Sequence, residues 1–307
     1  LKPLSRSPKL TDIAAGKTVN YNDIFEIISS LNLAIYTPSD FILASKIDKY
    51  TKEEGDDARF GNLSRAGRER GIRRLMGINL LKRLESSVNS FRLTLRRILA
   101  LIDGTVTSIN AIERNGGHTD IDEYNFYNGL DFDEREDTVF IGGKKSKIDL
   151  ADMDYVSWRN YLVEDRDNLK LLLSLLDDIS PEHDLKLQRL IEDIRDKFAR
   201  PINDNNKKII IFTAFSDTAQ YIYDNIARPI HEKYGLHTAL VTGDIEAKST
   251  LKLREKLDFN KVLTLFSPVS KEKAALYPNL NEEIDVLVAT DCISEGQNLQ
   301  DCDYLIN

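Results

Sequence analysis

Hydrophobic residues recur at helical spacing along residues 69–102, which is the strongest periodic pattern in the chain. Seven of them are separated alternately by three and four positions and so fall on one stripe of a helix. They are Leu81, Leu84, Val88, Phe91, Leu95, Ile98 and Ile102. The stripe is shorter than the sustained heptads of a coiled coil. The pattern predicts a helix that faces the core of a bundle, with a dimer zipper as the alternative.

Further helical patterns lie on both sides of this segment. Residues 23–33 and 39–50 are separated by Thr37-Pro38, and Ser39 is a candidate N-cap. Residues 154–176 are rich in leucine. Ser180-Pro181 supplies a cap and a first-turn proline for another helix that reaches Phe198.

Residues 115–150 interrupt the helical patterns as an acidic insertion. Gly142-Gly143 predicts a hairpin turn between strands at 139–141 and 148–150. Residues 1–200 are therefore expected to form a mainly helical accessory region that carries this insertion.

The pattern changes after the polar break at 201–206, where we place the domain boundary. Short apolar runs at 209–212, 239–241 and 286–289 alternate with helical patterns. Such alternation predicts parallel strands joined by right-handed crossovers. Between 254 and 284 we expect a surface insertion with a short helix. The expected fold class is α/β, with the helical region followed by a parallel-sheet lobe and its flanking helices.

Charge is distributed unevenly, although the net charge is −8. Residues 58–115 contain 12 Lys/Arg and 4 Asp/Glu, whereas residues 116–158 contain 4 and 11. A basic segment of this kind is a candidate phosphate track, and Arg92, Arg96 and Arg97 are its best candidates. Solvated helix faces that neutralise each other are the alternative.

Composition excludes several classes of site. The 2 cysteines are too few for a disulfide scaffold or a four-ligand zinc site, and the 4 histidines are scattered, so we expect no metal site. No apolar run approaches the ~20 residues that span a bilayer, so no membrane partner is expected. The expected compartment is a reducing cytoplasm.

Polar residues follow each of the three apolar runs. Thr213 follows the first, Thr242-Gly243 the second and Thr290-Asp291 the third. The third continues as Cys292-Ile293-Ser294-Glu295-Gly296-Gln297-Asn298-Leu299. In open α/β sheets, phosphate-bearing ligands bind where such strands end.

These three segments resemble, in order and spacing, the motifs of the second RecA-like lobe of superfamily 2 helicases and translocases. The last is similar to the form found in bacterial Swi/Snf-type ATPases. The resemblance implies that Thr213, Thr242, Gly243 and Thr290 contact a nucleic-acid backbone. It also implies that Glu295, Gly296 and Asn298 lie on the ATP side, with Asp291 coupling the two sites. Ordinary turn chemistry is the alternative for any single residue.

Two parts of such a motor are not recognisable in the sequence. Gly16-Lys17-Thr18 has Thr11 where a phosphate loop needs glycine, and no arginine-bearing motif follows residue 307. We therefore expect a truncated fragment that is inactive alone and binds no cofactor tightly. The intact parent would use ATP and Mg²⁺, pair this lobe with a first RecA-like lobe, and act on nucleic acid, with double-stranded DNA favoured. A helical protein-interaction module, with the lobe as scaffold, is the alternative function.

Overall fold

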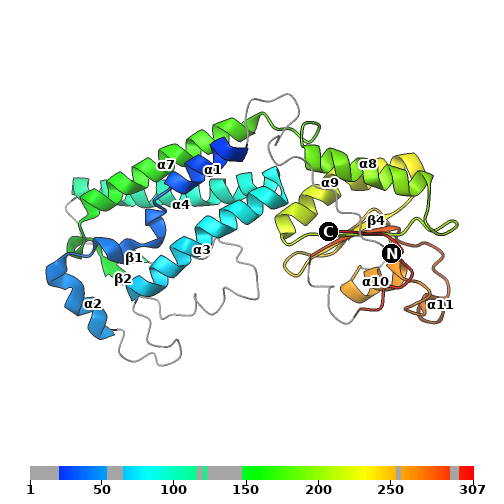
Figure 1. Ribbon diagram of the computed structural model, residues 1–307. Coiled ribbons are helices and arrows are strands. Elements are labelled where there is room, and N and C mark those ends of the chain that lie inside the picture. The colour runs from blue at the N-terminus through cyan, green and yellow to red at the C-terminus, as the bar shows by residue number, and fades with distance from the viewer. Residues whose placement is uncertain (1–20, 54–64, 116–119, 123–146, 254–256, 291–296) are drawn as a thin grey trace. The chain divides into compact units, whose positions relative to one another are not determined.

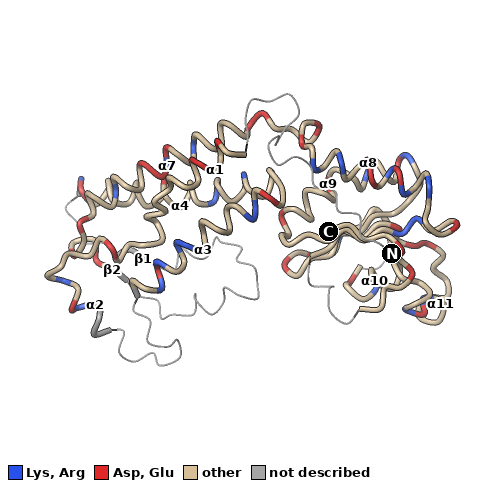
Figure 2. Tube along the Cα trace, in the orientation of Figure 1, with Lys and Arg blue, Asp and Glu red and all other residues tan. Residues whose placement is uncertain are grey.

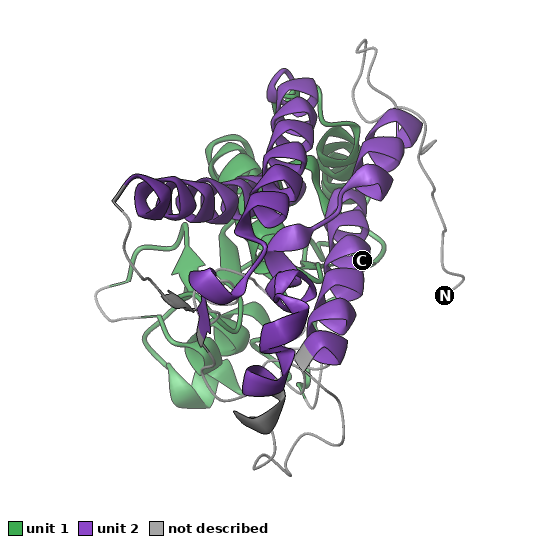
Figure 3. Cartoon of the chain, turned by 90° about the vertical axis from the view of Figure 1, so that its left-hand side faces the viewer, with its two compact units in different colours: residues 1–17, 86–90, 179–307 green, residues 18–85, 91–178 purple. Residues whose placement is uncertain are grey.

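A computed structural model describes residues 21–53, 65–115, 120–122, 147–253, 257–290 and 297–307. The chain divides into two compact units, coloured separately in Figure 3. The lobe unit comprises residues 1–17, 86–90 and 179–307, and the helical unit comprises 18–85 and 91–178. Each is considered by itself below.

The described residues of the helical unit form five helices, labelled in Figure 1. They are α1 (Tyr21–Ser30), α2 (Ile47–Glu53), α3 (Arg65–Ser86), α4 (Val88–Asn115) and α7 (Tyr155–Asp177). The helix expected over 154–176 is confirmed, and Asp154 caps it by accepting a hydrogen bond from the Ser157 N–H at 3.1 Å. Buried side chains from α3, α4 and α7 fill the core, including Met76, Leu95, Ile98, Trp158, Leu162 and Leu172.

The single helix expected over 69–102 is wrong, because the structure has two helices that meet at Ser87. The Ser87 hydroxyl accepts a hydrogen bond from the Ser90 N–H at 3.0 Å, as an N-cap does. The stripe is buried from Leu84 to Ile102, but Leu81 is only half-buried. Burial was thus predicted correctly for six of the seven positions, whereas the helix break was missed.

A buried carboxylate holds the turn that follows α1. Asp165 of α7 accepts hydrogen bonds from the N–H groups of Asn32 and Ala34, at 2.7 and 2.9 Å. Leu33, between them, has a φ of 50°, which is unfavourable for a leucine. Burial raises the pKa of Asp165, although the backbone hydrogen bonds oppose that rise.

Two other local expectations are wrong. The segment expected to be helical over 39–50 instead contains the 3-10 helices η2 (Pro38–Phe41) and η3 (Ala44–Lys46), and α2 begins only at Ile47. Ser39 is not an N-cap, because its N–H and hydroxyl both donate to Glu69, at 2.8 and 2.6 Å.

Of the hairpin expected between 139–141 and 148–150, only the second strand lies among the described residues. Strand β2 (Lys147–Asp149) pairs antiparallel with β1 (Asp120–Asp122), and residues 139–141 lie outside the described residues. The described part of this unit also contains the 3-10 helices η1 (Ala34–Tyr36) and η6 (Leu150–Asp152).

The lobe unit contains a five-stranded sheet in the order β5-β4-β6-β3-β7. Its strands are β3 (Ile209–Phe212), β4 (Thr238–Val241), β5 (Lys248–Ser249), β6 (Val286–Ala289) and β7 (Leu305–Ile306). Strands β4, β6, β3 and β7 are parallel, and β5 is antiparallel to β4. The parallel sheet expected from the three apolar runs is confirmed.

Helices cover both faces of this sheet. Helices α8 (Leu185–Ala199) and α9 (Ser216–Tyr234) pack on the face that carries Ile209 and Ile211. Helix α10 (Phe259–Phe266) packs on the face that carries Ile210. Successive strand residues alternate between the faces, so each continuous apolar run supplies both cores. The mixed α/β architecture agrees with a RecA-like lobe.

One expectation about the sheet-covering segments is corrected. The segment at 254–284 is not a surface insertion, because Val262, Leu263, Leu265 and Phe266 of α10 are fully buried. The short helix α11 (Lys273–Leu276) follows α10.

The last segment of the lobe unit, residues 179–307, starts upstream of the position 201–206 at which we place the domain boundary from the sequence. Leu187, Ile194 and Phe198 of α8 pack into the core beneath the sheet, which explains the difference. This helix is capped by Asp184, which accepts from the Leu187 N–H at 3.1 Å, and not by Ser180.

Candidate nucleic-acid interface

Three threonines directly follow three adjacent strands of the parallel sheet. In register, Phe212 lies beside Ala289, and Ala289 lies beside Val241. The next residues along the chain are Thr213, Thr290 and Thr242. Since neighbouring strands lie about 4.8 Å apart, the three backbones form one row at the carboxyl edge of the sheet. We call these residues the threonine row.

The backbone holds the threonine row in place beyond the ends of the strands. The Thr213 N–H donates to the Ala289 carbonyl at 3.0 Å, and the Thr290 N–H donates to the Val241 carbonyl at 3.3 Å. The exposed fractions are 9% for Thr213 and 8% for both Thr242 and Thr290. The backbone of the threonine row is therefore fixed, and only a small part of each threonine is exposed to solvent.

The turn after β4 adds polar groups beside the row. The Thr242 hydroxyl oxygen accepts a hydrogen bond from the Ile245 N–H at 3.3 Å, which leaves its proton for an acceptor. Gly243 is exposed and follows directly. Asp244 accepts a hydrogen bond from the hydroxyl of Ser216, the first residue of α9.

Of the three residues expected on the ATP side, Glu295 and Gly296 lie outside the described residues. The expected coupling residue Asp291 and the Gly16–Thr18 segment lie outside them too. Asn298 is described and exposed. Cys302 is a half-buried free thiol, and burial raises its pKa, which makes it a poor nucleophile.

The basic candidates on α4 contact the end of α7 within the helical unit. Arg92 donates to the Leu176 carbonyl at 3.3 Å, and Arg96 lies 3.6 Å from the Asp177 carboxylate. Arg97 is half-buried. Figure 2 shows basic positions along α3 and α4. Arg96 thus has an acidic partner at the end of α7. Most of the acidic 116–158 segment, at 116–119 and 123–146, lies outside the described residues.

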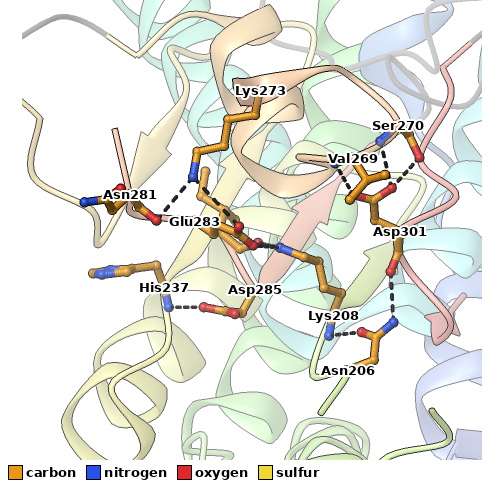
Figure 4. Close-up of polar contacts among 11 residues, drawn as sticks. Asn206, Lys208, His237, Val269, Ser270, Lys273, Asn281, Glu283, Asp285 and Asp301 are labelled. Atoms are coloured by element: carbon orange, nitrogen blue, oxygen red, sulfur yellow. Dashed lines mark hydrogen bonds and ion pairs between the residues drawn. The ribbon is translucent and has the colours of Figure 1, made fainter. Parts of the chain in front are cut away.

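The opposite, amino edge of the sheet carries paired charges (Figure 4). Lys208 donates to Glu283 at 2.9 Å, and Lys273 donates to the Asn281 carbonyl at 3.2 Å. The Asp285 carboxylate accepts from the His237 N–H at 2.9 Å, and burial raises its pKa. Lys208 and Lys273 are engaged with acceptors of the protein itself, so this is the less suitable edge for a phosphate.

Sequence reasoning missed one cluster beside the threonine row. The hydroxyl groups of Ser86, Ser87 and Thr218 lie within hydrogen-bonding distance of one another or of Thr213. The adjacent serines were the available signal, because serine inside an apolar helical pattern favours an N-cap.

A comparison with protein families bears on this unit. Residues 186–307 match the helicase conserved C-terminal domain. The match begins within α8, in agreement with the packing of that helix, and it covers the whole threonine row. The match supports the assignment of this part of the chain to the second lobe of a superfamily 2 helicase. Domains of this family belong to helicase- and translocase-type ATPases, and they engage nucleic acid and a partner lobe. No curated protein matches the chain.

The described residues contain neither a candidate metal site nor a candidate membrane span. They contain no group of three or more His, Cys, Asp or Glu that could hold a metal ion. In the same part of the chain, no helix is long and apolar enough to cross a membrane.

Proposed function

We propose that the lobe unit is the second RecA-like lobe of an ATP-dependent, Swi/Snf-type translocase, and that its threonine row contacts the backbone of double-stranded DNA. The observation that carries this proposal is the placement of Thr213, Thr290 and Thr242 at one level on three adjacent parallel strands. The row lies within the segment that matches the helicase domain.

The chemistry of the row suits a motor that moves along nucleic acid. Neutral hydroxyl and N–H groups bind phosphate oxygens without reading the base sequence. A translocase needs this property, because it must bind every step of its track equally well. At the amino edge of the sheet, Lys208 is paired with Glu283 and is therefore occupied. This contrast supports placing the DNA contact at the carboxyl edge.

The nucleotide side of the proposal rests on fewer residues. Of Glu295, Gly296 and Asn298, only Asn298 is described, and its side-chain amide is exposed. One exposed amide can donate to a nucleotide but does not form a phosphate cradle, so the described residues do not by themselves fit ATP and Mg²⁺. We assign ATP binding to the intact protein, together with a first lobe, and derive no chemical step through it.

The test measures binding of a labelled DNA duplex to the full chain. The variants Thr213→Val, Thr242→Val and Thr290→Val each remove a hydroxyl while keeping the side-chain shape. Each should weaken binding by about threefold to tenfold, the value of one hydrogen bond. Because a neutral group is lost, the dependence of affinity on salt should stay unchanged. Parallel titrations with single-stranded DNA and an RNA duplex identify the preferred track.

Thr238 supplies the matched control. It begins β4 at the amino edge, is fully buried, and within the described part of the chain its hydroxyl has no hydrogen-bond partner. Thr238→Val should leave DNA affinity unchanged and should raise stability by about 1 kcal/mol, because it removes an unsatisfied polar group. If the three edge variants bind DNA as tightly as this control, the threonine row is not part of the track.

A further inference from the structure

Four hydroxyl groups form a chain that ends at the threonine row. Ser87 Oγ lies 3.1 Å from Thr218 Oγ1, Thr218 Oγ1 lies 2.8 Å from Ser86 Oγ, and Ser86 Oγ lies 3.5 Å from Thr213 Oγ1. All four residues belong to the lobe unit. Ser87 and Thr218 are buried, with exposed fractions of 5% and 4%. The chain therefore runs from the interior of the unit to its edge.

The positions of the donors set the direction of this chain. Ser87 Oγ already accepts the Ser90 N–H at 3.0 Å, so the proton of Ser87 needs an acceptor, and Thr218 is the one within reach. Thr218 then donates to Ser86, and Ser86 donates to Thr213. If the hydroxyl groups donated in the opposite direction, the Ser87 hydroxyl would have no acceptor among the described residues. Leaving a buried donor without a hydrogen bond costs free energy.

This direction has a consequence for Thr213. Since its oxygen receives the proton of Ser86, its own proton points onward, to an acceptor at the sheet edge. Hydrogen bonds in a chain polarise one another, so the last hydroxyl becomes the better donor. The link at 3.5 Å is the longest of the three, and such links commonly shorten when a ligand binds.

We propose that Ser86 and Thr218 are positioning residues that make Thr213 a hydrogen-bond donor to a backbone phosphate oxygen. This inference rests on the proposed function of the threonine row. It makes the turn between α3 and α4 part of the phosphate site, although that turn lies 127 residues before Thr213.

The experiment compares DNA affinities of full-chain variants. Ser86→Ala and Thr218→Val should each weaken binding by about twofold to fivefold, less than the loss of the terminal hydroxyl itself. Ser86→Thr and Thr218→Ser, which retain the hydroxyl, should restore affinity. The control is Ser108→Ala on α4, whose exposed hydroxyl donates only within its own helix, to the Gly104 carbonyl at 3.0 Å.

A double-mutant cycle separates positioning from a loss of stability. If Ser86 acts through Thr213, adding Ser86→Ala to Thr213→Val should cause no further loss of affinity. Additive losses, or a failure of Ser86→Thr to restore binding, would overturn the relay. If Thr213→Val, Thr242→Val and Thr290→Val all bind DNA normally, the proposed function fails as well; if only Thr213→Val does, Thr213 is not a phosphate contact and the relay fails with it. If Thr213→Val is weakened while Ser86→Ala and Thr218→Val are not, only the relay is wrong.

Discussion

Lys197 of α8 and Asp303, two residues before β7, form an ion pair whose side chains are 1% and 11% exposed. Asp303 also accepts hydrogen bonds from the backbone N–H and the side-chain amide of Asn203, at 3.2 and 2.9 Å. The pair joins the helix that precedes the sheet to the segment that leads into its edge strand. It therefore fixes α8 as part of the lobe unit.

Removing one partner of this pair should destabilise the lobe unit strongly. Asp303→Ala would leave the Lys197 ammonium buried without its counter-ion, at a cost of about 3–5 kcal/mol in the free energy of unfolding. Adding Lys197→Met should recover much of that loss, because the buried charge is then gone. Chemical denaturation measures both. The exposed pair of Arg228 and Glu232 is the control, and Glu232→Ala should change stability little.

The apolar stripe that runs along α3 and α4 should stabilise the monomer. Leu95 is fully buried, so Leu95→Ala should lower the unfolding free energy by about 2–5 kcal/mol. Leu81→Ala, at a half-buried position of the same stripe, should cost clearly less. Size-exclusion chromatography completes the test. A wild-type dimer that Leu95→Ala dissociates into folded monomers would show that the stripe is an interface.

Stability should fall in mild acid because of His237. Burial, and then the stacked ring of His231 at 4.8 Å, lower its pKa below the usual 6.5. The unfolded chain therefore binds this proton more readily, so the unfolding free energy decreases as the pH falls below about 6.5. His237→Gln should show a smaller decrease between about pH 7.5 and 5.5.

The control for this pH dependence is His183→Gln, which also removes one histidine. Both variants keep Asp285, whose pKa is raised by burial, so the difference between the two curves isolates His237. Equal slopes for the two variants would contradict the assignment.

The basic candidates on α4 are tested by the salt dependence of DNA binding. If Arg96 and Arg97 contact phosphates, then Arg96→Glu with Arg97→Glu should weaken binding to all sequences. The slope of log affinity against log salt should flatten by about 0.9 for each lost contact. Asp177→Asn, which removes the carboxylate 3.6 Å from Arg96, is the matched control. An unchanged slope would assign these arginines to the contacts of α4 with α7.

The threonine row could be predicted from the sequence because each member follows a short apolar run. Parallel strands end at the same edge, so Thr213, Thr242 and Thr290 were expected near one another before their register was known. Their order across the sheet, with Thr290 in the middle, could not be predicted. It depends on β6 lying between β3 and β4, although β6 follows both in the sequence.

The errors have identifiable physical causes. Residues 262–266 are apolar apart from Thr264. A short apolar run of this kind does not by itself show whether it packs in the core or belongs to a surface insertion. Ser87 separates α3 from α4, but Leu84 and Val88 on either side of it keep the spacing of a continuous helix. The apolar pattern therefore gave no sign of the break. The docking of α8 depends on Asp303, more than 100 residues later, and no local pattern reports such a contact.

The turn at residues 86–90 also constrains how the protein can fold. Its hydroxyl partners Thr213 and Thr218 follow Ser86 by 127 and 132 residues. At a synthesis rate of about 5–20 residues per second, roughly 6–26 s separate their appearance at the ribosome. Until then water must satisfy these groups, because the lobe unit draws on distant parts of the chain and cannot be completed during synthesis of α3 and α4. For the same reason, a lobe expressed from residue 179 onward would lack the segment 86–90, which belongs to the same unit.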